Sequence, residues 1–141
     1  SRKPGTVGPE VLEGFSYPLQ QKEFPMPIIK ATYMATSEPF PGVTSLSLVT
    51  KESGSEKLTV LRMTISPGER IPLHYHPDHE EGIYLLEGTL QATHGDQEQA
   101  IVAGDVVLAS SGTRHGLANL SDEPAVIMAI FPTSEMTRVL L

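Results

Sequence analysis

The sequence of 141 residues contains no cysteine. That absence excludes a disulfide framework and any thiolate metal ligand, and it leaves the cellular compartment open. Basic residues are scarce as well, because 10 lysines and arginines stand against 17 acidic residues and give a formal net charge of -7. Nucleic acids and anionic membranes attract basic surfaces, so neither is expected as the main partner.

Apolar runs long enough to cross a bilayer are also missing. No segment has a sustained helical repeat, except the tail at 134–141, which could form one short helix. We expect a cytoplasmic protein, although a chain that begins at Ser1 leaves room for a leader removed earlier. The length suits one domain with a single buried core.

Short strand-like segments separated by glycine and proline turns make up most of the chain. They lie at 28–34, 43–50, 57–65, 89–93, 99–102 and 125–131. Many short strands at short spacing predict an all-β sandwich or barrel. Residues 1–27 are rich in proline and glycine and predict an irregular N-terminal arm, so the folded domain is expected to span 28–141.

Two histidines and a glutamate in one stretch have the spacing of metal ligands. His74 and His76 are two residues apart, so in a strand both side chains project to one face, about 7 Å apart along the backbone. Pro77 then breaks the strand, and Glu81 begins a second strand that can run back beside the first. Imidazoles with a carboxylate suit Zn, Fe, Ni, Cu or Mn better than Ca or Mg. A solvated histidine-rich loop is the alternative, but glycine turns and apolar alternation on both sides disfavour it.

A second segment, at 104–119, contains a glycine turn, a short apolar strand, another turn and then His115 on a new strand. Together the two segments resemble the two motifs of the cupin superfamily. The first motif runs from Gly68 to Gly88 as glycine, five residues, His-x-His, four residues, glutamate, six residues and glycine. The second runs from Gly104 to Asn119, and its anchor positions match except at Ser110, where the family has proline. A serine hydroxyl can still support that turn.

The resemblance implies a double-stranded β-helix, or jelly roll, with a metal ion inside the barrel. The implied ligands are His74, His76, Glu81 and His115. The implied cofactor is one divalent transition metal, with Fe²⁺ favoured and Ni²⁺, Mn²⁺, Zn²⁺ or Cu²⁺ as alternatives. Cupins of this size commonly dimerise through N-terminal strands, and a lone edge strand is a liability for a monomer, so a homodimer formed through 28–34 is expected.

The family spacing also separates neighbouring candidates of the same residue type. Six further residues reach Gly88 only from Glu81, so Glu80 is expected on the opposite strand face, solvated or in a salt bridge. His79 lies beyond the Pro77 break and His94 lies in a turn, so both are expected to be exposed loop histidines.

Four other side chains are candidates for the pocket wall around the ion: Arg62, Tyr75, Tyr84 and Met128. Ordinary core packing explains the tyrosines and the methionine equally well. Arg62 lies between apolar residues in a core-type strand and therefore needs an anionic partner or a route to solvent. It could bind a substrate carboxylate, or it could point outward and pair with a surface acid.

We therefore expect a metal-dependent enzyme that acts on a small organic substrate chelated to the ion. In the resembled family, three histidines plus glutamate accompany dioxygenases, oxalate-acting enzymes and non-redox isomerases, cyclases and lyases, whereas thiol dioxygenases generally lack the glutamate. A dioxygenase is the favoured interpretation. The alternatives are a non-redox isomerase, cyclase or lyase, and a non-catalytic module that binds a sugar or effector.

Overall fold

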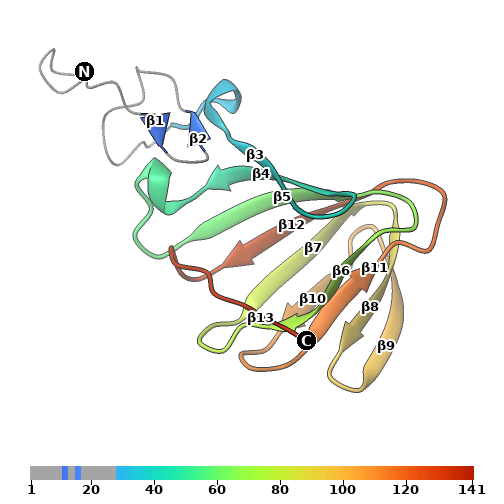
Figure 1. Ribbon diagram of the computed structural model, residues 1–141. Coiled ribbons are helices and arrows are strands. Elements are labelled where there is room, and N and C mark those ends of the chain that lie inside the picture. The colour runs from blue at the N-terminus through green and yellow to red at the C-terminus, as the bar shows by residue number, and fades with distance from the viewer. Residues whose placement is uncertain (1–10, 13–14, 17–27) are drawn as a thin grey trace, which may run out of the picture.

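The computed structural model describes residues 11–12, 15–16 and 28–141, and these residues are almost entirely β-structure (Figure 1). A six-stranded antiparallel sheet has the order β10-β7-β12-β5-β4-β3 and a five-stranded antiparallel sheet has the order β13-β6-β11-β8-β9. The first contains β3 (Thr36–Phe40), β4 (Val43–Val49), β5 (Thr59–Ile65), β7 (Glu81–Glu87), β10 (Val106–Ala109) and β12 (Ala125–Phe131). The second contains β6 (Arg70–Tyr75), β8 (Thr89–His94), β9 (Gln97–Val102), β11 (His115–Ala118) and β13 (Val139–Leu140).

The two sheets form a jelly roll, because the chain passes from one sheet to the other at every connection from β5 onward except the β8–β9 hairpin (Figure 1). The predicted all-β class and cupin-type fold are confirmed. The strands β6 and β7 lie in different sheets, so the expectation that Glu81 starts a strand beside the one bearing His74 is wrong. Residues on these two strands instead face each other across the interior.

The core lies between the inner faces of the two sheets. Period-two alternation creates it, since Ile83 and Leu85 of β7 are buried together with Ile127 and Ala129 of β12. Full burial of an isoleucine or leucine side chain contributes about 1.5–3 kcal/mol of favourable transfer free energy. This apolar layer holds the two sheets together.

Two residues of the family motifs fix turns at the end of the barrel. Gly88 has a φ of 88°, and a Cβ there would lie 2.7 Å from the carbonyl oxygen of Pro124, so only glycine fits. Asn119 is fully buried, and its Nδ2 donates to the carbonyl oxygens of Ile65 and Glu123 at 2.9 and 2.8 Å. These contacts anchor the connection between β11 and β12.

Two local expectations are corrected by the structure. Residues 28–34 form no strand, because a 3-10 helix (Ala31–Tyr33) closes there and β3 begins only at Thr36. Pro39 is tolerated in β3 because that strand is the edge of its sheet. The tail forms no helix, since β13 pairs with β6 instead. A second short 3-10 helix (Lys51–Ser53) joins β4 to β5.

The N-terminal arm proposed for 1–27 lies outside the described residues, apart from β1 (Val11–Leu12) and β2 (Phe15–Ser16), which pair as a two-stranded antiparallel sheet. Within the part of the chain that the structure describes, no helix is long and apolar enough to cross a membrane.

Candidate metal centre

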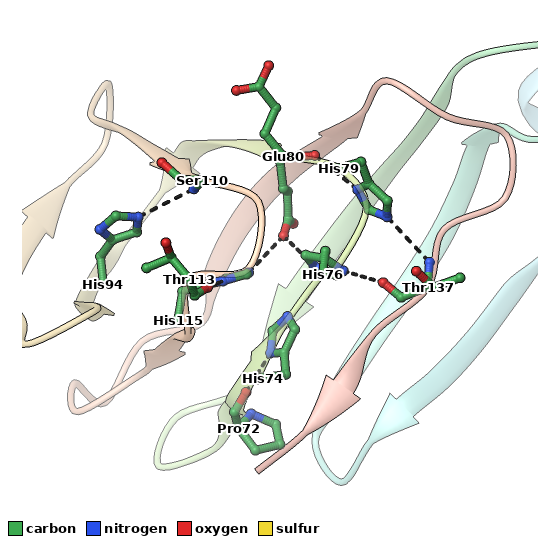
Figure 2. A network of polar contacts seen from close by, with 11 residues as sticks. Pro72, His74, His76, His79, Glu80, His94, Ser110, Thr113, His115 and Thr137 are labelled. Carbon is green, nitrogen blue, oxygen red and sulfur yellow. Dashed lines mark hydrogen bonds and ion pairs between the residues drawn. The ribbon is translucent and has the colours of Figure 1, made fainter.

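The four predicted ligands converge from both sheets of the barrel. His74 on β6 lies directly opposite His115 on β11 in the five-stranded sheet, and His76 follows the end of β6. Glu81 is the first residue of β7 and reaches in from the six-stranded sheet. One ligand atom from each of the four lies within 4.8 Å of every other. Figure 2 shows the three rings turned toward one point.

Backbone carbonyls fix the orientation of the three imidazoles. The Nδ1 atom of His74 donates to Pro72 O at 2.7 Å, that of His76 to Thr137 O at 2.6 Å, and that of His115 to Thr113 O at 2.9 Å, as the dashed lines of Figure 2 mark. A carbonyl oxygen can only accept, so Nδ1 carries the hydrogen in each ring. Each Nε2 is therefore left free to act as a metal ligand.

The carboxylate of Glu81 closes the cluster. Its Oε1 lies 3.0 Å from Nε2 of His76 and 3.1 Å from Nε2 of His115. All four residues are between 2% and 5% exposed, so water cannot form hydrogen bonds with these closely spaced acceptor atoms and relieve their mutual repulsion. Either a proton or a cation must sit between such acceptors. Imidazole nitrogen with carboxylate oxygen is the donor set of a divalent transition metal.

Burial and the neighbouring charges perturb these groups in different directions. Burial is the main cause that lowers the pKa of His74 to about 4, so its ring is neutral at pH 7. For His76 burial also acts to lower the pKa, but the hydrogen bonds to Glu81 and Thr137 outweigh it and the pKa lies above its usual value. Burial acts to raise the pKa of Glu81, yet the hydrogen bonds from His115 and His76 hold it below its ordinary value.

A small cavity of about 30 Å³ opens onto the cluster. Its polar side chains are the four candidate ligands and Arg138. The remaining side chains in its wall are apolar: Phe40, Leu61, Met63, Ile71, Ile83, Leu117, Ile127, Phe131 and Met136.

The four predicted pocket residues, Arg62, Tyr75, Tyr84 and Met128, do not line this cavity. Arg62 lies opposite Met128, and Met128 lies opposite Tyr84, in one row across the outer face of the six-stranded sheet. Strand alternation explains this row, because the neighbours of these residues in the sequence occupy the inward positions. Arg62 adopts the outward alternative and lies 3.8 Å from Glu87. Tyr75 lies between the inward His74 and His76 and pairs with β13.

The prediction for His79 is wrong, because this side chain is buried rather than exposed. Its ring stacks on that of His76 with centroids 4.9 Å apart, and its Nε2 accepts a hydrogen bond from the Thr137 backbone N–H at 3.3 Å. His76 and His79 therefore both form hydrogen bonds with the backbone of Thr137, one with its carbonyl oxygen and one with its N–H (Figure 2). Glu80 is exposed, as predicted. His94 is half-buried at the end of β8, and its Nε2 accepts from Ser110 N at 3.4 Å.

Among the cavity-wall residues that sequence reasoning missed are Phe40, Met136 and Arg138. Phe40 belongs to an edge strand that contains a proline, and the other two lie in a segment without regular periodicity. No local signal in the sequence marks them.

Comparison with known proteins gives a family match over half of the chain. The family model described as Cupin domain matches residues 61–131, which include all four candidate ligands. The tetracenomycin polyketide synthase protein TcmJ of Streptomyces glaucescens is 28% identical over 92 residues, which are 64% of this chain and 62% of that protein. Quercetin 2,3-dioxygenase of Bacillus subtilis (strain 168) is 30% identical over 63 residues, 45% of this chain and 19% of that protein. The chain thus spans only part of these relatives.

Among solved structures, the polyketide cyclase RemF from Streptomyces resistomycificus superposes with a TM-score of 0.70 at 20% identity. The superposition covers 82% of this chain and 85% of that one. At this identity the likeness supports the jelly-roll fold alone.

Proposed function

The chain belongs to the cupin family, and from that premise we propose that it is a metal-dependent enzyme acting on a small organic substrate. The proposed metal ligands are His74, His76, Glu81 and His115, and the favoured ion is Fe²⁺. The observation that carries this proposal is a buried cluster of three imidazoles, each oriented by a carbonyl on its Nδ1, whose ligand atoms lie within 4.8 Å of one another and of the Glu81 carboxylate. When bound, the ion would be chelated by oxygen atoms of the substrate and, if redox-active, would allow the substrate to react with dioxygen.

The protein's own groups then have limited tasks. The apolar wall excludes water and favours a largely apolar substrate. Among the described residues that line the cavity, the only ionisable side chain besides the four candidate ligands is Arg138, whose guanidinium offers hydrogen-bond donors and no acceptor. A reaction that needs a separate acid or base is therefore poorly served. An enol or catechol substrate would lose one proton on chelation, to Glu81 or to solvent, and its later reaction with dioxygen would need no further acid or base; this supports dioxygenase chemistry, and a quercetin dioxygenase is among the relatives.

A second candidate function is non-redox cyclisation of a polyketide-like substrate. The similarity to a tetracenomycin polyketide synthase protein favours it. Lewis-acid activation of a chelated carbonyl would use the same four ligands and the same apolar wall.

The first test combines metal analysis with oxygen uptake. Protein purified without an affinity chelate should contain about one equivalent of a divalent transition ion. In an oxygen electrode, a panel of diketones, catechols and keto acids should reveal a metal-dependent uptake of oxygen for at least one compound. Protein without any bound transition ion would contradict the metal proposal, and turnover without oxygen uptake would favour the cyclase.

Metal affinity is expected to fall about tenfold for each pH unit below the pKa of His76. That pKa lies above its usual value, so the ion must displace a proton from His76 near neutral pH, and acid strengthens the competition. His74, with a pKa of about 4, adds a second proton only near that pH. Chelator competition from about pH 5 to pH 8, with calorimetry in two buffers to count protons released, measures this. An affinity independent of pH would exclude a ligand shell that includes His76.

We also propose a homodimer, although 28–34 provides no strand for it. The outer face of the six-stranded sheet exposes Leu108 (60%), Tyr84 (41%) and Ile130 (40%). Leu108 and Ile130 both pair with Gly82 in the sheet, so these side chains are neighbours across one continuous face. Contiguous exposed apolar surface of this kind is characteristic of protein interfaces.

Light scattering should therefore give the mass of a dimer for the wild type and of a monomer for Ile130→Lys. A matched control is Val102→Lys, because Val102 is also an exposed β-branched residue but lies on β9 in the other sheet. A wild-type monomer, or dissociation by the Val102 variant alone, would contradict the proposed face.

A further inference from the structure

The cavity above the candidate metal centre is too small for an organic substrate as it stands. Its volume of about 30 Å³ is that of about one water molecule, whereas pockets for small organic ligands measure roughly 300–1,000 Å³. Part of the wall must move when substrate enters.

The C-terminal segment is the part of the wall least restrained by sheet hydrogen bonds. Met136 and Arg138 lie in residues 132–138, which join β12 to β13 without belonging to a strand. The other lining side chains, apart from His76, belong to strands of the two sheets. Thr137, which lies between Met136 and Arg138, forms hydrogen bonds with His76 and His79. The segment is therefore fixed at Thr137, while the side chains of Met136 and Arg138 close the cavity.

Arg138 places a permanent positive charge at this closure. Its guanidinium carbon lies 4.6 Å from the centre of the Phe40 ring, and Phe40 itself lines the cavity. Within the described part of the chain, no carboxylate lies within 4.0 Å of Arg138 to neutralise it. Stacking on an aromatic face leaves the guanidinium edge, with its paired N–H donors, available for another partner.

We propose that Arg138 determines specificity by binding a carboxylate on the substrate, at the end remote from the metal-chelating oxygens. This inference rests on the proposed function, because it concerns the same cavity. A guanidinium edge matches the two oxygens of a carboxylate in a bidentate pair. The substrate class is thus a largely apolar compound with a chelating oxygen pair at one end and a carboxylate at the other.

Two catechols of similar size test this assignment in the full-length protein loaded with Co²⁺, whose visible spectrum reports ligand binding. Both 3,4-dihydroxybenzoate and 4-methylcatechol carry the same chelating pair, but only the first has a carboxylate at the opposite end of the ring. The wild type should prefer the carboxylate compound, and Arg138→Gln should reduce that preference by about tenfold. Comparing the ratio between variants cancels the intrinsic difference between the two chelators.

The controls separate Arg138 from a general loss of structure. Arg138→Gln should weaken binding of 4-methylcatechol less than binding of 3,4-dihydroxybenzoate, and Arg138→Lys should retain part of the preference. Arg62→Gln, which removes an arginine from the outer face of the sheet, should change neither affinity.

An unchanged preference in Arg138→Gln would overturn the proposal, as would failure of both catechols to bind Co²⁺-loaded protein. Failure of the wild type to bind Co²⁺ would be a different result, because it would contradict the metal centre itself.

Discussion

Replacing Glu81 with alanine is expected to lower metal affinity by at least about 100-fold. Loss of a residue that merely supports a ligand commonly costs about 10- to 100-fold, and Glu81 is proposed to bind the ion directly. Its Oε1 lies within 3.1 Å of Nε2 in both His76 and His115, so no other described carboxylate can take its place. The change also removes the negative charge that offsets a divalent cation in a buried site.

Glu80→Ala is the matched control for this experiment. It removes the same side chain one position earlier in the sequence, where the residue is exposed and outside the cluster. Chelator competition and elemental analysis after dialysis should give near wild-type occupancy for Glu80→Ala and near-zero occupancy for Glu81→Ala. Thermal unfolding of the metal-free proteins shows whether either variant is misfolded. Equal metal loss in the two variants would refute the assignment of Glu81.

The candidate ligand set could be predicted from the sequence because local spacing and the resemblance to the two cupin motifs act together. Strand parity places His74 and His76 on one face, and the count to Gly88 distinguishes Glu81 from Glu80. The Gly88 turn shows why that count is restrictive, since a Cβ there would contact the backbone of Pro124.

The sheet to which each strand belongs could not be predicted in the same way. An alternating pattern specifies which residues share a face, but it does not say whether the next strand pairs beside the first or crosses the barrel. For β6 and β7 the crossing arrangement is observed, and it brings Glu81 toward the histidines from the opposite sheet. The meeting of the four candidate ligands was therefore predicted, but the placement of β6 and β7 in different sheets was not.

The errors concern residues whose environment is created by distant parts of the chain. His79 follows a proline in a polar loop, yet Thr137 and Phe131 return to cover it. The same C-terminal segment places Arg138 at the cavity, whereas the sequence had suggested Arg62 as the arginine that could bind a substrate carboxylate. Strand parity alone argued against Tyr84 as a pocket residue. Its sequence neighbours Ile83 and Leu85 share the face of Glu81, so Tyr84 points to the opposite face, and the structure places Ile83 and Leu85 in the core.

Replacing the native ion with Zn²⁺ is expected to abolish turnover while leaving the fold and substrate binding intact. Zn²⁺ accepts the same imidazole and carboxylate ligands but has no accessible redox change to offer dioxygen. The four ligands and the apolar wall are unchanged by the exchange, so a bound substrate should still raise the unfolding temperature of the Zn²⁺ form by mass action. Protein stripped of metal and reloaded with Fe²⁺ is the control for damage during the exchange, and it should recover activity only in the presence of oxygen.

The opposite result identifies the second candidate function. A cyclase that uses the ion as a Lewis acid should remain active with Zn²⁺, should work without oxygen and should consume none. Assays of the Fe²⁺ and Zn²⁺ forms, each with and without oxygen, therefore give non-overlapping outcomes for the two reactions. Because the described residues that line the cavity supply no acid or base beyond the proposed ligands, the cyclase would also have to rely on Glu81 or on the substrate's own groups for proton transfer. Turnover by the Zn²⁺ form under anaerobic conditions would replace the dioxygenase proposal with this one.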